Sequence, residues 1–234
     1  MTLTSDLFGK KVLISRVWLR HPAIDGGGSE VGVAVVSPAK AAVGRVSAVG
    51  SGGWFTRSPT SSLRPGGGGA FARTKFPVNT PGEAFTAYVG NPYKNITDIS
   101  TYIPNGDGSS RFVRNTGSVL LCKAAAAVGV ASGNITFPHL GRGGLASDSV
   151  GDTKRDGATA ALGSNVTGAS AGDDQDFNPL GFGWPGVSSE SKTPVCHGAG
   201  GIGRYLLGVD SFEFEITPGC GEICIEWFTE DPGY

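Results

Sequence analysis

Glycine is the residue type that most constrains how this chain folds. The chain has 234 residues, of which 39 are glycine, and four of these stand together at Gly66–Gly69 before a run of alternating large and small residues at 70–78. Glycine loses more backbone freedom on folding than any other residue, so such a block is a close-packing segment, a linker or a disordered stretch. Hydrophobic residues make up 39% of the chain, with four tryptophans among them. This content favours a folded chain with long glycine-rich loops.

Alternation of large and small or polar residues predicts strands along the chain. In the first of them, Ile14 and Trp18 are expected to share one face, opposite Val17 and Leu19. Gly44 is expected to interrupt a short third strand. The early strands are predicted at 11–20, 31–36 and 43–49.

Three pairs of neighbouring runs predict β-hairpins. In the first, Pro81 presets the backbone angle of a turn, and Gly82 tolerates the positive φ that a type II turn requires. The paired runs are 70–78 with 84–90, 211–216 with 222–228, and 110–113 with 119–123. The fold class we expect is mainly β, an antiparallel β-sandwich-like scaffold with long glycine-rich loops.

Charge and hydropathy restrict the partners that we expect. The net charge is −1, which gives no bulk electrostatic reason to bind nucleic acid or an anionic membrane. Residues 1–6 lack the basic-then-apolar pattern of a signal peptide, and no apolar run approaches the roughly 20 residues that span a bilayer. We therefore expect a soluble product made in a cytoplasm, without nucleic-acid binding or membrane insertion.

The cysteines are expected to be reduced, mostly buried thiols, as in most cytoplasmic products. They are Cys122, Cys196, Cys220 and Cys224. Zinc at Cys196-His197 with Cys220 and Cys224 is a weaker alternative, because these spacings match no standard ligand set. Calcium at the acidic run 173–176 is another, although the EF-hand spacing is absent. We predict no metal and no cofactor.

Motifs of enzymes are missing from the sequence. It has no Gly-x-Ser-x-Gly elbow, no phosphate-binding loop and no His-Glu-x-x-His pair. Glu213 and Glu215 lie two residues apart beside a turn, so we interpret them as a solvated strand face rather than as a catalytic pair. We do not expect an enzyme.

The combined pattern resembles the glycine-rich domain of bacteriophage tail fibres and related virion proteins. The shared features are a strand that runs into glycines (31–36), the glycine block before Thr80-Pro81-Gly82-Glu83 and Val89-Gly90, a Gly-Ser-Ser-Arg-Phe step (108–112), a small-residue run (123–130), a glycine-rich tract (141–203) and a closing strand that ends in Glu-Trp (223–227). The resemblance covers residues 31–228. Residues 1–30 lie outside it and are expected to be an N-terminal strand or attachment segment, whereas residues 31–234 are expected to form a glycine-rich β domain.

The resemblance also implies a function, that of a virion structural protein in a tail fibre or spike that binds the host cell surface. Expected partners are other virion proteins, further copies in a homo-oligomer, and a host surface glycan or protein. Aromatic and arginine side chains dominate recognition sites, so the expected contact residues are Trp54, Phe55, Arg57, Tyr93, Tyr102, Phe182 and Trp184. The alternatives are a capsid or tail decoration protein without receptor recognition and, less favoured, a polysaccharide-degrading fibre domain.

Overall fold

The computed structural model describes residues 13–20, 32–53, 67–91, 108–127, 143–159, 198, 202–206, 211–216 and 219–231. These residues form strands and two short 3-10 turns, η1 (Thr116–Ser118) and η2 (Ala146–Asp148). The strands are β1 (Leu13–Arg20), β2 (Gly32–Val36), β3 (Val43–Val49), β4 (Phe71–Pro77), β5 (Ala84–Tyr88), β6 (Ser110–Arg114), β7 (Val119–Ala124), β8 (Thr153–Arg155), β9 (Ile202–Leu206), β10 (Ser211–Ile216) and β11 (Glu222–Phe228). The predicted fold class, mainly β with antiparallel sheets, is confirmed.

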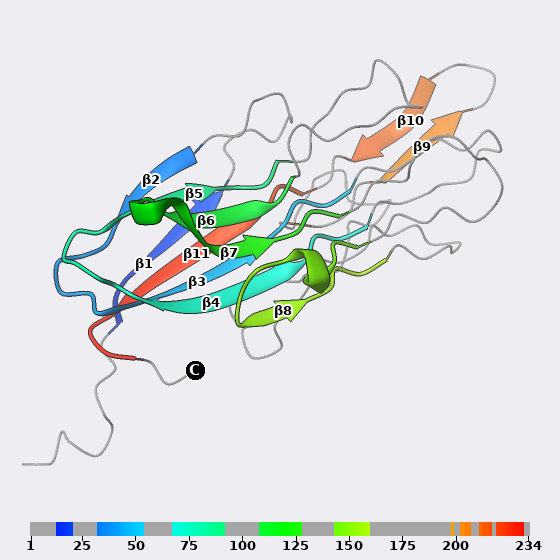
Figure 1. Ribbon diagram of the computed structural model, residues 1–234. Coiled ribbons are helices and arrows are strands. Elements are labelled where there is room, and N and C mark those ends of the chain that lie inside the picture. The colour runs from blue at the N-terminus through cyan, green and yellow to red at the C-terminus, as the bar shows by residue number, and fades with distance from the viewer. Residues whose placement is uncertain are drawn as a thin grey trace, which may run out of the picture.

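Two antiparallel sheets lie face to face as the layers of a sandwich (Figure 1). The larger sheet has the strand order β1-β11-β3-β4-β8, and the smaller has the order β2-β5-β6-β7. β9 and β10 pair separately with each other. β1, which the sequence assigns to the segment 1–30, is an edge strand of the larger sheet through its pairing with β11.

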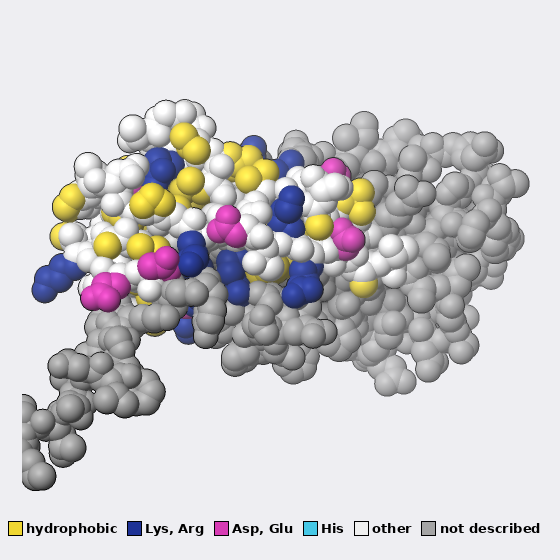
Figure 2. Space-filling view, turned by 60° about the horizontal axis from the view of Figure 1, so that its bottom comes forward, with side chains coloured by type: hydrophobic (Ala, Val, Ile, Leu, Met, Phe, Trp, Pro, Cys, Tyr) yellow, Lys and Arg dark blue, Asp and Glu magenta, His cyan; other side chains and the backbone are white. Residues whose placement is uncertain are grey.

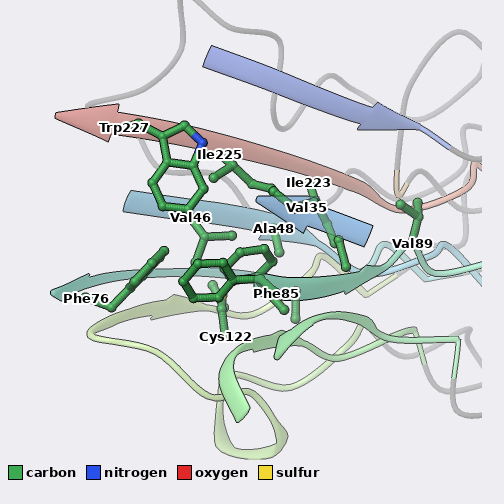
Figure 3. Close-up of a cluster of buried hydrophobic side chains, with 14 of the residues drawn as sticks. Val35, Val46, Ala48, Phe76, Phe85, Val89, Cys122, Ile223, Ile225 and Trp227 are labelled. Carbon is green, nitrogen blue, oxygen red and sulfur yellow. The ribbon is translucent and has the colours of Figure 1, made fainter. Parts of the chain in front are cut away.

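The core lies between the two sheets and is built from one face of each (Figure 3). From the larger sheet, β11 contributes Ile223, Ile225 and Trp227 to it, all buried and at period two. From the smaller sheet come Phe85 and Phe112, whose rings stack with 5.1 Å between centroids. Trp227 meets Phe85 at 5.6 Å, which ties the two sheets together through aromatic contacts.

Gly44 does not interrupt its strand, and an aromatic ring fills the space that a side chain at this position would occupy. β3 runs unbroken from Val43 to Val49. Gly44 pairs with Phe76 on β4, and a Cβ at Gly44 would lie 2.2 Å from the Cζ atom of Phe76. A glycine is therefore the residue that lets this ring cross the neighbouring strand and enter the aromatic cluster.

Two of the three predicted hairpins are wrong, and both turns instead carry the chain from one sheet to another. β4 pairs with β3 and β8, whereas β5 pairs with β2 and β6. β10 pairs with β9, whereas β11 pairs with β1 and β3. Alternation and turn residues identify the strands but not their partners, because a sandwich needs such crossings as much as it needs hairpins. The hairpin of β6 and β7 is confirmed.

The first crossing retains the turn that the sequence predicts. Gly82 has a φ of 72°, as a type II turn requires. The buried carboxylate of Glu83, just before β5, accepts a hydrogen bond from the backbone N of Asn79 at 2.9 Å and pairs with Arg114 on the neighbouring strand β6 at 2.9 Å. The side chain of Glu83 thus links this turn to the smaller sheet.

A β-bulge in β1 changes the predicted faces of that strand. The pairing with β11 shifts register between Leu13 and Ser15. Ile14 consequently packs against the main core together with Leu19, while Trp18 packs on the opposite face of the sheet. Placing Ile14 and Trp18 on one face was therefore wrong, because a bulge breaks the period of two.

Candidate functional site

One end of the sandwich is extended by glycine-rich backbone rather than by strands. Residues 50–53 follow β3. The N–H groups of the first three residues donate to three different segments, and the N–H group of the fourth donates to the same segment as the first. The bonds are Gly50 N to Ala70 O (3.0 Å), Ser51 N to Gly108 O (3.1 Å), Gly52 N to Gly219 O (3.0 Å) and Gly53 N to Gly67 O (2.8 Å). A backbone that repeats every three residues and is hydrogen-bonded to neighbouring segments rather than within itself has the geometry of a polyproline II-type helix.

Residues 67–70, which lead into β4, are bonded to their neighbours in the same way. The bonds are Gly68 N to Ala158 O (3.0 Å), Gly69 N to Gly198 O (2.8 Å) and Ala70 N to Ala125 O (2.8 Å). We call the set of segments joined by such bonds the glycine bundle; it comprises 50–53, 67–70, 90–91, 108–109, 125–127, 143–144, 157–158, 198 and 219–221.

Backbones in the glycine bundle approach too closely for side chains. An added Cβ at Gly69 would lie 2.1 Å from the carbonyl oxygen of Gly50, and one at Gly157 would lie 2.0 Å from that of Gly68. At Gly143 the corresponding distance to the oxygen of Gly157 is 1.8 Å. Because these contacts are made by backbone, they cannot be relieved by a side-chain rotation. Glycine in the bundle is core material.

The side chain of Ser110 connects the glycine bundle to the sheets through hydrogen bonds. The buried hydroxyl of Ser110 donates to the carbonyl oxygen of Val49 at 2.6 Å and accepts from the backbone N of Gly90 at 3.0 Å. Gly221 N donates to Gly90 O at 2.7 Å. β3, β6 and β11 thus continue into the bundle through one connected set of bonds.

The glycine bundle gathers the ends of four long connections. These connections are residues 54–66, 92–107, 128–142 and 160–197. Bundle segments stand directly on either side of each in the sequence, except that Thr159 separates 157–158 from the fourth connection. Gly53 bonds directly to Gly67 across the first connection, and Ala127 N donates to Ser51 O at 2.9 Å beside the third. The roots of these connections are therefore held in fixed positions relative to one another.

All seven expected contact residues lie outside the described residues, so the structure does not place them. In sequence they belong to three of the four connections whose roots the bundle holds: Trp54, Phe55 and Arg57 to 54–66, Tyr93 and Tyr102 to 92–107, Phe182 and Trp184 to 160–197. The described geometry brings together the ends of these connections and says nothing further about the side chains.

An ionic cluster on the outer face of the larger sheet escaped the sequence reasoning. The carboxylate of Glu226, whose side chain is 2% exposed, lies 2.6 Å from Arg16 on β1 and 2.8 Å from Arg45 on β3. Four residues before Glu226 on the same strand, Glu222 pairs with Arg20. The signal was present in the sequence, because arginines and glutamates recur four residues apart on β1 and β11, which places each set on one face of its strand. Buried carboxylates held by arginine are structural charge pairs rather than free acid–base groups.

The described thiols are unreactive by their surroundings. Cys122, Cys220 and Cys224 form no disulfide, in keeping with the expected reduced thiols; Cys196 lies outside the described residues. Burial raises the pKa of Cys220 to about 11. Burial, then the nearby charge of Glu226, raises the pKa of Cys224 to about 12, and burial raises that of Cys122 further. Thiols held neutral in this way are poor nucleophiles and poor metal ligands.

In the view of Figure 2, basic and acidic side chains are interspersed on the described surface, and hydrophobic side chains lie singly or in small groups. Among the described residues, no three His, Cys, Asp or Glu side chains lie close enough together to hold a metal ion. Within the same ranges, no helix is long and apolar enough to cross a membrane.

Comparison of the sequence with models of known protein families and with curated proteins finds no match.

Proposed function

We propose that the chain is a bacteriophage virion structural protein, a component of a tail fibre or spike that contacts the host cell surface. The observation that carries the proposal is the glycine bundle, which fixes the roots of four long connections at one end of a rigid sandwich. Binding residues are disproportionately found on loops that a rigid scaffold positions.

In this proposal the glycine bundle is a rigid support for the connections that bind the receptor. The backbone of each bundle segment is hydrogen-bonded to neighbouring segments, and glycine lets the segments pack without side chains between them. The sequence of the connections is thereby freed from holding the fold together. Those connections contain aromatic and arginine side chains, and side chains of these types supply most of the energy at recognition sites.

In a virion, other structural proteins and further copies of the chain are the proposed partners, with a host surface glycan or protein as the receptor. The virion is the proposed location, after synthesis in the host cytoplasm. The second candidate function is a capsid or tail decoration protein without receptor recognition. The ionic cluster and the buried, neutral thiols suit a durable particle component, and they serve either function equally.

Binding to cells separates the two candidates. Fluorescently labelled protein is incubated with the bacterium that the parent phage infects, and the same preparation is tested for its ability to block infection. Receptor contact predicts saturable binding that blocks infection; binding should weaken tenfold or more when Trp54, Phe55 and Arg57 are replaced together by alanine.

The matched control is Lys40→Ala, which also removes a positive charge but lies in the exposed turn at the opposite end of the sandwich. It should bind as the natural chain does. Protein that neither binds cells nor blocks infection, yet associates with purified particles, supports the decoration protein instead.

A further inference from the structure

Three of the four edges of the two sandwich sheets carry features that discourage pairing with another chain. β8 is three residues long and two of them are basic. β1 carries Arg16 and Arg20 and a bulge near its start. In β7, the backbone of Lys123 is bonded to Val150 in both directions, at 2.9 and 2.8 Å, which covers the end of that edge and leaves Val119 at its start exposed. The register of β7 with β6 is also irregular, with a shift between Phe112 and Val113. Short length, charge, bulges and cover are the usual protections of edge strands.

The fourth edge, β2, has none of these protections. Its sequence, Gly-Val-Ala-Val-Val, contains no charge and no proline, and its register with β5 is continuous. Val33 is 37% exposed and Val36 is 62% exposed. Within the described ranges no strand pairs with its other side. An uncharged, regular and exposed edge is a template for another strand.

The hydrogen-bond pattern shows which backbone groups of β2 point outward. Ser37 N donates to Glu83 O at 2.9 Å, in register with the pairing of β2 and β5. Antiparallel ladders alternate, so Val33 and Val35 direct their N–H and C=O groups toward β5. The groups of the intervening residues, Gly32, Ala34 and Val36, therefore point away from the sheet.

We propose that the β2 edge pairs with the β2 edge of a second copy of this chain, antiparallel and about a two-fold axis at Ala34. In that register Ala34 faces the partner's Ala34, and Gly32 faces the partner's Val36. Each of these pairs exchanges two N–H···O bonds, since every outward group of one strand meets an outward group of the other. The two smaller sheets become one continuous sheet.

A second copy suits this edge because the strand is complementary to itself. Pairing brings Val33 beside the partner's Val35 on the core side and covers its exposed surface. On the outer side, Val36 lies over the partner's Gly32, where the Tyr88 ring occupies the place of a side chain, 2.9 Å from the ideal Cβ. Self-pairing of β1 or β8 would instead bring arginine and lysine side chains of like charge together.

The dimer is expected to be weak outside an assembly. Five residues of edge pairing bury less than the roughly 1,200 Å² of a standard interface. Sedimentation analysis of the full chain over a concentration series should show a monomer–dimer equilibrium in the micromolar range or weaker. A chain that stays monomeric up to millimolar concentration, or that forms trimers without dimers, overturns the proposal.

Two substitutions at the centre of the interface test the geometry. Ala34→Pro removes an outward N–H that β5 does not use, so the sandwich keeps its own bonds. Ala34→Lys keeps that N–H and places two like charges across the axis. Each should weaken dimerisation about tenfold or more, while Val119→Lys, at the exposed opposite edge of the same sheet, should leave it unchanged. Equal dimerisation of the Ala34 variants and the natural chain contradicts the proposal.

Crosslinking tests the register. Residues facing each other in a hydrogen-bonded antiparallel pair have Cα atoms about 5.5 Å apart, within disulfide range. Oxidation of Ala34→Cys should therefore give a covalent dimer. Ala84→Cys, exposed on β5, should not, because the β5 strands of the two copies would lie about 14 Å apart or more. The natural chain, treated alongside, reports crosslinks through its own four cysteines. Absence of the Ala34→Cys dimer, or equal dimer from Ala84→Cys, refutes the register.

Discussion

Replacing Gly69 by alanine tests whether the glycine bundle behaves as core. The new Cβ would lie 2.1 Å from the carbonyl oxygen of Gly50, so the segments 50–53 and 67–70 must separate by about 1.3 Å or more to restore an ordinary contact. That movement breaks the bonds from Gly50 to Ala70 and from Gly53 to Gly67, now 3.0 and 2.8 Å long. Each buried donor left without a partner costs about 1–3 kcal/mol.

The net loss from the two bonds is about 1–5.5 kcal/mol, because alanine also restricts the unfolded chain and returns about 0.4–1 kcal/mol. Urea unfolding followed by tryptophan fluorescence measures it. With a slope near 3 kcal/mol per molar, typical of the larger two-state proteins, the midpoint should fall by about 1 M.

The matched control for Gly69→Ala is Gly53→Ala in the same bundle. There the nearest atom to the new Cβ is the Cβ of Ala127 at 3.2 Å, a contact that small shifts relieve. Both substitutions restrict the unfolded chain equally, so their difference isolates the packing. If the two variants unfold at the same urea concentration, the close packing of the bundle does not stabilise the protein and the reasoning fails.

Three further substitutions or titrations address the sheets. Glu226→Gln removes the charge that holds two arginines, and should lower the free energy of unfolding by about 2 kcal/mol; a midpoint equal to that of the natural chain would show the cluster to be dispensable. Gly44→Ala puts a Cβ 2.2 Å from the ring of Phe76, and by overpacking should cost about 1–3 kcal/mol, whereas an unchanged thermal midpoint would mean that the ring has room. Cys122 and Cys224 should resist a thiol reagent until the protein unfolds. Folding raises the pKa of Cys224 from 9.0 to about 12, so the unfolded thiol ionises first, and its contribution falls by about 1.4 kcal/mol per pH unit between those values. Substituting Cys224 by alanine should flatten that decline, and an identical slope would contradict the assignment.

Most strand positions could be predicted from the sequence because they depend on local alternation, whereas β8 and β9 were missed because they begin within the glycine-rich tract at 141–203. β11 shows this most clearly: its period of two places Ile223, Ile225 and Trp227 on the core face, as found. The partners of each strand could not be predicted, because a Pro-Gly turn such as that at 81–82 fits a crossing between sheets as well as a hairpin. Pairing depends on contacts far apart in sequence, such as that between β1 and β11.

The role of glycine could be predicted only in outline. The sequence leaves close packing, linkage and disorder open for a block such as Gly66–Gly69, because the choice depends on neighbours that the block itself does not specify. In the structure those neighbours come from segments as distant as Gly157 and Gly198. The candidate site has the same limitation: the roots of its connections are fixed by such bonds, whereas the expected contact residues lie beyond them.

Amide hydrogen exchange, resolved by residue, tests the central claim most directly. The claim is that glycine segments of the bundle are as ordered as the strands that they extend. Amides of Gly52, Gly69 and Gly144 all donate to backbone carbonyls of other segments, and should exchange as slowly as those of the central strand β11. Exchange of these three amides at the rate of an unfolded chain, while β11 stays protected, would contradict it.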